Sequence, residues 1–583
     1  MALVASACGG NDDDDSGAGG VAAEATAAPD APSGGDDPPA PSGDGDGGGD
    51  AGSGDQDGDS QADQGGESSG AEETPAQDGG EAPLAPAEPQ YGGTLTFGLE
   101  AETNNGWNPV TAQPAVSGHI VLRSMYDTLT TELADGTVAP YLLESFSSND
   151  DFTEWTLTMR PGITFHDGLP ADSVAVQRHF EELQKGVLTG LVFSDVELQE
   201  VQIVDDLTAK VILGRPVAVF PDYLTAFLGY LASPAMYDLG EDSARNPIGT
   251  GPYMLDEWVP NEVTRVVRNP NYWRTDAEGR QLPYLDAIEF RPIPDSDTRF
   301  AALRSGDLDA SVDNTGTRIE EYTEEFNSVW EPQAYGNVTY LMFNNQAPPF
   351  DNVEFRRALA QCTDRQTYNN LRWDGQPPAN GPFSVGTPGY LEDSGFPTYD
   401  PDAGRAVIER LGISEVELGT TNDSANLLST ELLAEMWRQC GIDVSITQVD
   451  QAELINNAIF GLFTAFLWRN HNGFELALER SWWHSKYSRG IAINFGRITD
   501  DRIDAALDEA FVADDPEASR ALAEEVNRVF ADQVYNLWFY FSNWVVGAQD
   551  YVRGVDELTL PEGGERLTLM EGRAFLGEVW LDQ

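Results

Sequence analysis

The side chains that could do chemistry in this 583-residue chain are few and widely spaced. No His-Glu-x-x-His motif is present, and no two histidines have the close spacing of paired metal ligands on one element. A metal site would have to be assembled by the fold, and His471 with His484 is the pair to suspect. Packing or solvated roles are commoner for isolated histidines, so we predict no metal and no cofactor. The five histidines are His119, His166, His179, His471 and His484.

Three short segments have the form of chemical motifs, and each lacks the context that its chemistry needs. Residues 66–70, Gly-Glu-Ser-Ser-Gly, match a hydrolase nucleophile elbow, but the polar segment around them offers no strand-to-helix turn. Residues 55–60 begin like a calcium loop, yet serine stands where that loop requires glycine. Residues 249–251, Gly-Thr-Gly, are not followed by the lysine of a phosphate-binding loop. We therefore expect a protein that is not an enzyme.

The first ninety residues contain no Lys, Arg or Trp and are dominated by Gly, Asp, Ala, Pro, Ser and Glu. Such a segment buries too little apolar surface to offset the entropy of ordering its backbone. Its charges repel one another and its glycines and serines are flexible, so it would extend over roughly 50 Å or more. We predict a disordered acidic linker at residues 9–90.

Residues 1–8 resemble the end of a lipoprotein signal peptide. A short apolar run and a small residue precede Cys8, and the polar linker follows at once. The basic region and most of the apolar stretch of such a signal are missing, so we expect the true translation start to lie further upstream. Cys8 is accordingly a predicted lipidation site that would anchor the protein to a membrane.

The charge of the chain excludes one class of partner. It carries 98 acidic side chains against 33 basic ones, a formal net charge of −65, and only 21 of the acidic residues lie in the first ninety. A nucleic acid is itself a polyanion, so we predict no nucleic-acid binding. The acidity would serve solubility or suit a cationic ligand. The remaining residues, nearly five hundred, are enough for more than one domain.

Periodicity predicts a mixed α/β fold. Trp155, Leu157 and Met159 alternate with polar residues, and Pro161-Gly162 then turns the chain, which predicts a half-buried hairpin. The segments around the Asp205-Asp206 turn predict a hairpin, and 263–267 and 286–291 predict further strands. Helical spacing of apolar residues predicts helices over 353–371, 402–411, 426–440 and 501–531.

Two cysteines remain after Cys8. Cys362 and Cys440 each follow apolar residues at helical spacing, so each should lie on the buried face of its helix. They form either two inert core thiols or one disulfide, and the sequence cannot show whether the sulfurs meet.

Several longer motifs occur in a fixed order along the chain. The first is Tyr-Asp-Thr-Leu at 126–129, and the second is Trp-Thr-Leu-Thr-Met-Arg-Pro-Gly-Ile-Thr-Phe-His-Asp-Gly at 155–168. Asn-Pro-Ile-Gly-Thr-Gly-Pro-Tyr at 246–253, Arg-Asn-Pro-Asn-Tyr-Trp at 268–273 and Ala-Leu-Arg-Ser-Gly-Asp-Leu-Asp at 302–309 follow. Together they resemble the family 5 extracytoplasmic solute-binding proteins, the peptide, opine and nickel receptors of ABC importers.

That resemblance implies a two-lobed, periplasmic-binding-protein-like fold in which the ligand lies between the lobes. We expect lobe I at 91–292 and 536–583, with an extra subdomain near 132–250, and lobe II at 293–535. Closure of the lobes around the solute would present the closed shape to a permease, with no covalent chemistry.

The resemblance also implies two ligand-binding segments. Residues 115–117 stand where peptide-binding members offer an extended backbone edge, and an ordinary surface loop is the alternative. Near 466–471 those members carry a Trp and, three residues on, an Asp that pairs with the peptide α-ammonium. Here Trp468 is present but His471 replaces the Asp. An imidazole cannot do a carboxylate's work, which disfavours a free amino terminus unless Glu475 substitutes.

Aromatic residues are dense around this second segment, and flat rings suit sugars, cations and apolar side chains alike. Two arginines could clamp a ligand carboxylate or could pair with surface acids. The predicted ligand-binding residues are Ala115, Val116, Ser117, Trp468, Arg469, Asn470, His471, Trp482 and Arg489.

The sequence therefore predicts a monomeric, lipid-anchored, extracytoplasmic substrate-binding protein of an ABC importer, with permease and ATPase subunits as partners. Its ligand would be peptide-like or another small organic solute. An oligosaccharide or metal-chelate receptor is the alternative among binding proteins, and an envelope sensor without a transport role is the alternative outside them.

Overall fold

The computed structural model describes residues 88–583, except 103, 104, 113, 115, 374, 423, 450, 472 and 557. Cys8, the predicted signal segment 1–8 and nearly all of the predicted linker at 9–90 lie outside these residues. Within the described part of the chain, no helix is long and apolar enough to cross a membrane.

The strands pair into a seven-stranded, a five-stranded and a four-stranded sheet, with further two-stranded pairs. Their bounds are Thr94–Leu99 (β1), Thr130–Glu132 (β2), Val138–Pro140 (β3), Leu143–Ser148 (β4), Glu154–Met159 (β5), Leu198–Ile203 (β6), Thr208–Leu213 (β7), Tyr253–Val259 (β8), Val263–Arg268 (β9), Ala287–Pro292 (β10), Ala310–Asp313 (β11), Asn327–Trp330 (β12), Asn337–Phe343 (β13), Glu415–Thr421 (β14), Asp443–Val449 (β15), Ala465–Asn470 (β16), Asn536–Ser542 (β17), Val545–Ala548 (β18), Val552–Arg553 (β19), Leu569–Met570 (β20), Arg573–Ala574 (β21) and Trp580–Leu581 (β22).

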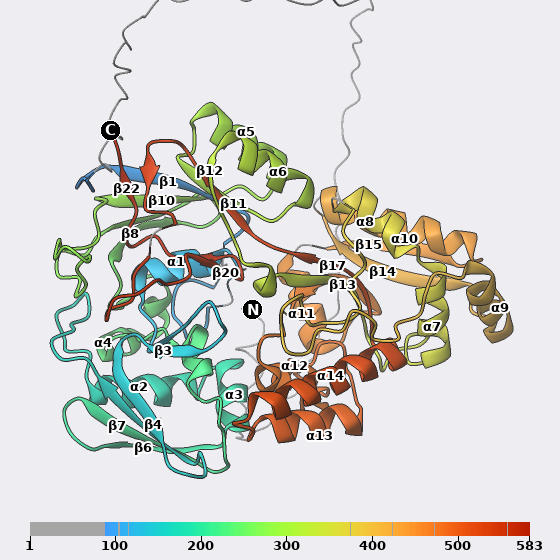
Figure 1. Ribbon diagram of the computed structural model, residues 1–583, viewed down its shortest axis with the longest axis horizontal. Helices are drawn as coiled ribbons and strands as arrows, with labels where there is room; N and C mark the ends of the chain where they lie inside the picture. Colours follow the sequence, from blue (N-terminus) through green and yellow to red (C-terminus); the bar gives the residue numbers. More distant parts are fainter. Residues whose placement is uncertain are drawn as a thin grey trace, which may run out of the picture. The chain divides into compact units, whose positions relative to one another are not determined.

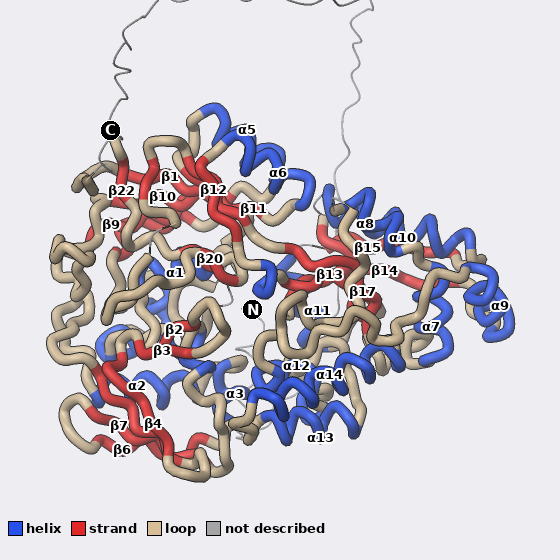
Figure 2. Tube along the Cα trace, viewed as in Figure 1, coloured by secondary structure: helices blue, strands red, loops and turns tan. Residues whose placement is uncertain are grey.

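Helices are most frequent between residues 353 and 533, and Figure 2 shows them concentrated in the right half of the view. The α-helices are Gly118–Met125 (α1), Ser173–Leu183 (α2), Thr189–Asp195 (α3), Pro234–Tyr237 (α4), Ser296–Ser305 (α5), Gly316–Glu325 (α6), Val353–Cys362 (α7), Arg365–Arg372 (α8), Pro401–Leu411 (α9), Ser424–Gln439 (α10), Gln451–Phe460 (α11), Arg480–Trp483 (α12), Asp501–Ala510 (α13) and Pro516–Gln533 (α14). The 3-10 helices are Asp222–Leu224 (η1), Phe227–Gly229 (η2), Gly240–Ala244 (η3), Gln333–Tyr335 (η4), Leu476–Glu479 (η5) and Ser485–Tyr487 (η6).

The seven-stranded sheet is assembled from distant parts of the chain. Its order is β12-β18-β11-β1-β10-β9-β8, with β1 parallel to both β10 and β11 and the other pairs antiparallel. β18, from near the C-terminus, lies between β11 and β12. Parallel neighbours such as β1 and β10 need a long crossover, and here that crossover contains all the structure from α1 to β9.

The five-stranded sheet has the order β15-β14-β16-β13-β17. β14 runs parallel to β15 and β16, whereas β13 is antiparallel to β16 and β17. Helix α10 packs on β14 and β15, and α8 packs on β17. In the view of Figure 1, α8 and α10 lie above this sheet and α14 lies below it. The described chain thus combines β-sheets with helices that pack on them, which confirms the predicted α/β class.

The chain passes between the two large sheets at two places. β12 belongs to the seven-stranded sheet and β13 to the five-stranded one, and β17 and β18 make the return passage. The passages are therefore residues 331–336 and 543–544. The lobe boundaries expected at 292/293 and 535/536 differ from these points. Residues 293–330 pair with the first sheet through β11 and β12, and β17 pairs with β13 in the second. Hydrogen-bonded partners decide to which sheet each strand belongs, and the resemblance alone does not give them.

The four-stranded sheet, β4-β5-β7-β6, lies within the predicted extra subdomain. β6 and β7 form the hairpin expected around Asp205, whose side-chain oxygen accepts the backbone N–H groups of Leu207 and Thr208. In β5, Trp155, Leu157 and Met159 are buried and alternate with half-buried neighbours, as the sequence predicts. However, β5 pairs with β4 and β7 and not across the Pro161-Gly162 turn.

Three of the sequence motifs meet at one buried carboxylate. Asp127 is 1% exposed, and its oxygens accept hydrogen bonds from Thr250 Oγ1 (3.0 Å), Tyr272 Oη (3.1 Å) and Trp273 Nε1 (2.8 Å). Burial raises the pKa of Asp127, although the three donors oppose that rise. The motifs at 126–129, 246–253 and 268–273 are thus parts of one structural junction.

Two glycines of the 246–253 motif allow close packing of backbone. A Cβ on Gly249 would lie 2.1 Å from the carbonyl oxygen of Met125, and one on Gly251 would lie 2.4 Å from the Met125 carbonyl carbon. No side chain fits at either position without displacing α1. Gly-Thr-Gly therefore serves packing, in agreement with its lack of a phosphate-binding sequence.

Two predicted helices are each divided into two. The segment 353–371 forms α7 and α8, and 501–531 forms α13 and α14. Each second helix starts with an aspartate cap, because Asp364 accepts from the Thr367 N–H and Asp515 from the Glu517 N–H. Pro516 at the first position of α14 also prevents continuation from α13.

Cys362, at the end of α7, and Cys440, after α10, are both buried and form a disulfide with a Cα–Cα distance of 6.2 Å. The bond closes a sequence separation of 78 residues. Of the two alternatives left by the sequence, the disulfide is the one that the structure contains.

Candidate functional site

A cavity of about 280 Å³ is lined by segments from both parts of the chain that the passages at 331–336 and 543–544 separate. On the first side are α1, the β2–β3 turn, η1 and the β20–β21 hairpin. On the second side are η4, the start of β13, the end of β16, and η5 with α12. We call it the acidic cavity, and its lining is Val116, His119, Glu132, Gly136, Asp222, Tyr335, Asn337, Asn470, His471, Phe474, Glu475, Leu478, Glu479, Trp482, Glu571 and Arg573.

The end of β16 positions the central side chains of this cavity. β16 pairs antiparallel with β13 as far as Asn470, whose Oδ1 accepts a hydrogen bond from Tyr340 Oη at 2.7 Å. The next residue, His471, has φ 65°, a left-handed conformation in which the chain turns away from the sheet. Glu475 then accepts the Ala477 N–H at 3.0 Å and caps η5, which leads into α12.

The lining carries five carboxylates and one guanidinium. Arg573 forms ion pairs with Glu571 and, at 3.7 Å, with Glu132. Glu479 Oε2 lies 2.6 Å from His471 Nδ1. For the remaining two, Asp222 and Glu475, no ion-pair partner occurs among the described residues.

Burial shifts the protonation of these carboxylates. Burial, together with the nearby charges of Glu475 and Glu132, raises the pKa of Asp222 to about 8. Burial likewise raises the pKa of Glu475 and of Glu132. In contrast, burial and then the Arg573 charge lower the pKa of His119, so this imidazole is neutral and supplies no positive charge.

Aromatic rings form the other part of the wall. Tyr335 and Phe474 are stacked with centroids 4.3 Å apart. The Tyr335 hydroxyl donates to the Leu133 carbonyl at 2.7 Å and so joins η4 to the β2–β3 turn. Trp482 packs edge-on against His471 (5.5 Å) and Phe495 (5.1 Å). The cavity therefore combines flat apolar faces with a concentration of carboxyl groups.

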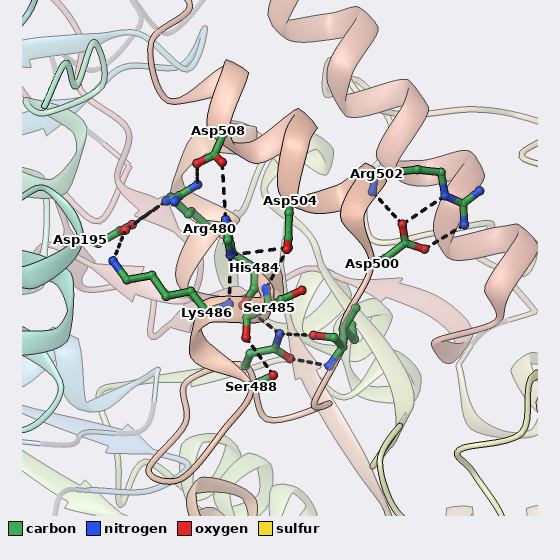
Figure 3. A network of polar contacts seen from close by, with 12 residues as sticks. Asp195, Arg480, His484, Ser485, Lys486, Ser488, Asp500, Arg502, Asp504 and Asp508 are labelled. Atoms are coloured by element: carbon green, nitrogen blue, oxygen red, sulfur yellow. Dashed lines mark hydrogen bonds and ion pairs between the residues drawn. The ribbon is translucent and has the colours of Figure 1, made fainter.

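A second polar region joins the four-stranded-sheet segment to α12 and α13 (Figure 3). Asp195, the last residue of α3, and Arg480 of α12 each have a side chain only 3% exposed, and they form an ion pair at 2.9 Å. Arg480 also pairs with Asp508 of α13 at 2.5 Å, and Lys486 Nζ lies 3.4 Å from Asp195. We call these residues the Asp195–Arg480 network.

Residues 137–491, which are more than half of the chain, match the family described as bacterial extracellular solute-binding proteins, family 5, middle region. The chain belongs to this family. Its members are binding proteins and not enzymes.

Two relatives are similar to this chain over more than half of its length. The chain is 27% identical over 347 residues to the glutathione-binding protein GsiB of Salmonella paratyphi A. The matched region covers 57% of this chain and 65% of GsiB. GsiB of Pectobacterium atrosepticum is 25% identical over 357 residues, covering 59% of this chain and 67% of that protein. The chain thus spans about two thirds of the length of these relatives.

Solved structures share the fold at lower identity. AgaA of A. tumefacien R10, in complex with agropinic acid, superposes with a TM-score of 0.73 at 21% identity over 84% of this chain and 99% of AgaA. DppA of Helicobacter pylori, in complex with the peptide STSA, has a TM-score of 0.73 at 20% identity over 85% and 99%. AppA of Bacillus subtilis, in complex with a nonapeptide, has a TM-score of 0.72 at 19% identity over 85% and 100%. These matches show the periplasmic-binding-protein fold.

Four of the predicted ligand-binding residues of this family 5 protein line the acidic cavity: Val116, Asn470, His471 and Trp482. His471 is 7% exposed, and its Nδ1 lies 2.6 Å from Glu479 Oε2. A carboxylate is therefore close to the position at which His471 replaces the family's Asp. Glu475, named from the sequence as a substitute, also lines the cavity.

The structure places four other predicted residues away from the cavity lining. Ser117 is fully buried with a helical backbone, and its carbonyl accepts the Ile120 N–H at 3.0 Å, so it offers no extended edge to a ligand. Trp468 packs on Phe495, and Arg469 pairs with Glu100 at 3.3 Å. Arg489 is exposed.

Two predicted residues lie outside the described part of the chain, namely Ala115 and Cys8. Of the backbone edge expected at 115–117, the structure describes Val116 and Ser117. The carbonyl groups of these two residues already accept hydrogen bonds in the first turn of α1, so they do not form an extended edge.

The sequence prediction missed Glu132, Asp222, Tyr335, Glu571 and Arg573. In a chain with 98 acidic residues, three more carboxylates carry no signal of their own. One local sign was available at Glu571, which precedes a glycine within a short hairpin and adopts φ 50°. Only the fold brings these five residues to one cavity.

The two histidines suspected of binding a metal serve different polar regions. His471 holds Glu479 in the cavity, whereas His484 lies near Asp504 and Asp508 in the Asp195–Arg480 network (Figure 3). Within the described residues, no group of three or more His, Cys, Asp or Glu side chains is arranged to hold a metal ion.

Proposed function

We propose that this protein is the solute-binding component of an ABC importer and that the acidic cavity holds a peptide-like or other small organic solute. Family membership supports the binding role. The observation that carries the choice of site is a cavity of about 280 Å³ lined from both sides. Its volume is near the lower end of typical ligand pockets, roughly 300–1,000 Å³, and suits a solute the size of a short peptide.

The names of the relatives support a small organic solute. GsiB is a glutathione-binding protein, AgaA was solved with agropinic acid, and DppA and AppA were solved with peptides. These ligands share small size and several polar groups. We propose a ligand of this class, small and with several polar groups, for this chain. We do not assign a single compound.

The two large sheets would form the cores of two lobes, with the passages at 331–336 and 543–544 as the hinge. The four-stranded sheet would form the extra subdomain of the first lobe. A solute bound to both walls of the cavity would favour the closed arrangement, because a ligand shifts an equilibrium toward the state that it contacts best. The permease would then receive the closed form.

The cellular setting follows from the same proposal. The protein would act outside the cytoplasm as a monomer, anchored through acylated Cys8, with the linker at 9–90 as a spacer from the membrane. Permease and ATPase subunits would be its partners, and neither nucleic acid nor a cofactor would take part.

Native mass spectrometry of the full-length chain, purified without denaturation, tests this function. We expect a co-purified small molecule that is lost from Trp482→Ala, because Trp482 forms part of the cavity wall. Trp330→Ala is the matched control, since Trp330 is 44% exposed on β12 and lies outside the cavity lining. A protein that carries no solute and shows no thermal shift with peptides, sugars or nickel chelates would contradict the proposal.

A further inference from the structure

We propose that two buried arginines, Arg123 and Arg566, hold a small inorganic anion such as chloride beside α1 and the β20–β21 hairpin. This site is separate from the acidic cavity, whose lining includes neither arginine. Both guanidinium groups are buried without an anionic partner, and each has nitrogen atoms without a hydrogen-bond acceptor.

The buried arginines of the described chain differ in how their guanidinium groups are satisfied. Four of them form ion pairs with carboxylates, namely Arg274, Arg299, Arg480 and Arg573. Two others, Arg356 and Arg497, donate to backbone carbonyl oxygens. Arg123 and Arg566 are also buried, but among the described residues neither forms an ion pair nor donates to a carbonyl oxygen. These two arginines are therefore the exceptions.

Three nitrogen atoms of the two exceptions lack an acceptor. They are Nε and Nη2 of Arg123 and Nη1 of Arg566, and all three are shielded from solvent. Arg123 is 4% exposed and Arg566 is 7% exposed. A guanidinium group only donates hydrogen bonds, and burying a charged donor without an acceptor is costly. An anion would supply both the missing acceptor and the missing charge.

Elements that pack on one another bring these side chains together. Arg123 lies in the last turn of α1, which packs on β21. Shortly after β21, the N–H of Phe575 donates to the Thr568 carbonyl at 3.2 Å. This bond holds the segment that contains Arg566 alongside the end of the hairpin. The anion site would thus lie where α1, β21 and the segment before β20 meet.

The groups around Arg123 leave its charge uncompensated. The Tyr230 hydroxyl stabilises the charge but carries none of its own. Burial and the charges of Arg573 and Arg566 lower the pKa of Arg123 to about 10, so it remains charged at neutral pH. The charge of Glu132 interacts with Arg123, but this carboxylate already pairs with Arg573 at 3.7 Å. The cluster therefore holds more positive than negative charge.

Arg566 has only aromatic neighbours for its charge. Its Cζ lies 4.4 Å from the ring centroids of both Tyr141 and Phe575. Aromatic faces attract a cation, but they offer no lone pair to its N–H groups. The rings therefore hold the side chain in place and leave Nη1 for another acceptor.

The burial of the site favours a small inorganic ion over a carboxylate of the solute. Arg573 lines the acidic cavity, whereas Arg123 and Arg566 do not. A solute in the cavity would meet the already paired Arg573 first. Because the unpartnered nitrogens are shielded from solvent, their occupant must consist of very few atoms. A halide meets this condition and accepts hydrogen bonds from any direction.

Thermal unfolding of the full-length protein, freed of any co-purified solute, tests this proposal in sodium salts of equal concentration. Chloride is the probe, gluconate is too large for a buried site, and acetate represents a carboxylate. We expect the melting temperature to rise saturably by about 2 °C or more in chloride relative to gluconate. An anion that binds only the folded state stabilises that state.

Arg123→Met and Arg566→Met should each remove the difference between chloride and gluconate, because methionine donates no N–H group. Arg291→Met is the control variant, since it loses the same charge outside the cluster. Arg291 is 44% exposed on β10 and pairs with Glu289 at 3.0 Å. We expect this control to retain the full chloride difference, and circular dichroism would verify that all three variants are folded.

Crystals of the unmodified protein soaked in sodium bromide would locate the ion directly and keep the test decisive if a variant does not fold. We expect an anomalous peak in contact with the guanidinium groups of Arg123 and Arg566. Absence of this peak, or a chloride difference that survives in both variants, would overturn the proposal. Stabilisation by acetate and not by chloride would overturn the inorganic ion and assign the site to a carboxylate. Solute binding in the acidic cavity does not depend on any of these results.

Discussion

The acidic cavity and the Asp195–Arg480 network bring the same kinds of side chain together with opposite results. In the network, Asp195 is 3% exposed and faces Arg480 at 2.9 Å, with Lys486 beside it. In the cavity, Asp222 and Glu475 have no ion-pair partner among the described residues, and the charge of Glu475 acts on Asp222. A buried carboxylate beside a guanidinium is compensated, whereas an uncompensated one is costly to hold in its charged form. The difference separates a compensated junction from the cavity that we propose as the ligand site.

Removal of Arg480 should have the largest effect on stability. Among the described residues, Arg480→Met leaves the buried Asp195 with two cationic neighbours, the partly exposed Lys486 and Arg215 at 3.9 Å. We expect the free energy of unfolding to fall by about 3 kcal/mol or more, as for other broken buried pairs. Urea denaturation followed by tryptophan fluorescence measures this loss.

Arg528→Met provides its control. Arg528 is half exposed on α14 and pairs with Glu524 at 2.9 Å, so its loss should cost less than about 1 kcal/mol. Equal losses for the two variants would show that the network is no stronger than a surface pair.

The same chemical change should have opposite signs in the two regions. Asp195→Asn removes the partner of a buried guanidinium and should lower the free energy of unfolding by about 2 kcal/mol. Asp222→Asn removes an uncompensated carboxylate and should raise it by about 1 kcal/mol at pH 8 without ligand. Thermal unfolding of both variants under ligand-free conditions makes the comparison, and equal signs would contradict it.

The pH dependence of stability should distinguish Asp222 in particular. Its pKa is raised from 3.8 to about 8 in the folded protein. Between these values the folded state holds a proton that the unfolded state has released, so stability falls as the pH rises from about 4 to about 8. The difference in melting temperature between the unmodified protein and Asp222→Asn should therefore grow across this interval.

A difference that stays constant with pH would mean that Asp222 titrates normally. Glu331, whose pKa burial raises to about 8, contributes a slope of the same sign in both proteins. His166 and His179, whose pKa values burial lowers to about 4, contribute the opposite slope below pH 6.5. Because these groups are common to both proteins, the difference isolates Asp222.

Lys486→Ala should have the smallest effect. The Lys486 side chain is 47% exposed, and its ammonium lies 3.4 Å from an aspartate that Arg480 already holds. We expect a loss below about 1 kcal/mol in urea denaturation. A loss as large as that of Arg480→Met would assign Lys486 the main role in the network.

Much of the fold could be predicted because local patterns indicate local elements. The alternation at Trp155, Leu157 and Met159 and the Asp205 turn correctly predicted β5 and the β6–β7 hairpin. Two helices were predicted too long because apolar spacing continues across the caps Asp364 and Asp515. The lobe boundaries differ from the observed passages because a strand's sheet is decided by remote partners, such as β18 between β11 and β12.

The candidate site was less accessible to sequence reasoning. Asn470, His471 and Trp482, three of the predicted residues, line the cavity, and they lie within one stretch of chain around a recognisable motif. Trp468 and Arg489 belong to the same stretch, but they point into a packed contact and to the surface. Spacing along the chain cannot tell which side of a loop faces a cavity.

The sequence by itself determined the family, the α/β class and the acidic character of this protein, because motif order, periodicity and composition are properties of the chain alone. Only the tertiary structure decided that Cys362 and Cys440 are bonded, that three motifs share Asp127, and which carboxylates are compensated. Asp195 and Arg480 are separated by 285 residues, and Asp222 and Glu475 by 253. Charge is carried by single residues, but its compensation depends on distance and burial, and only the folded chain sets these.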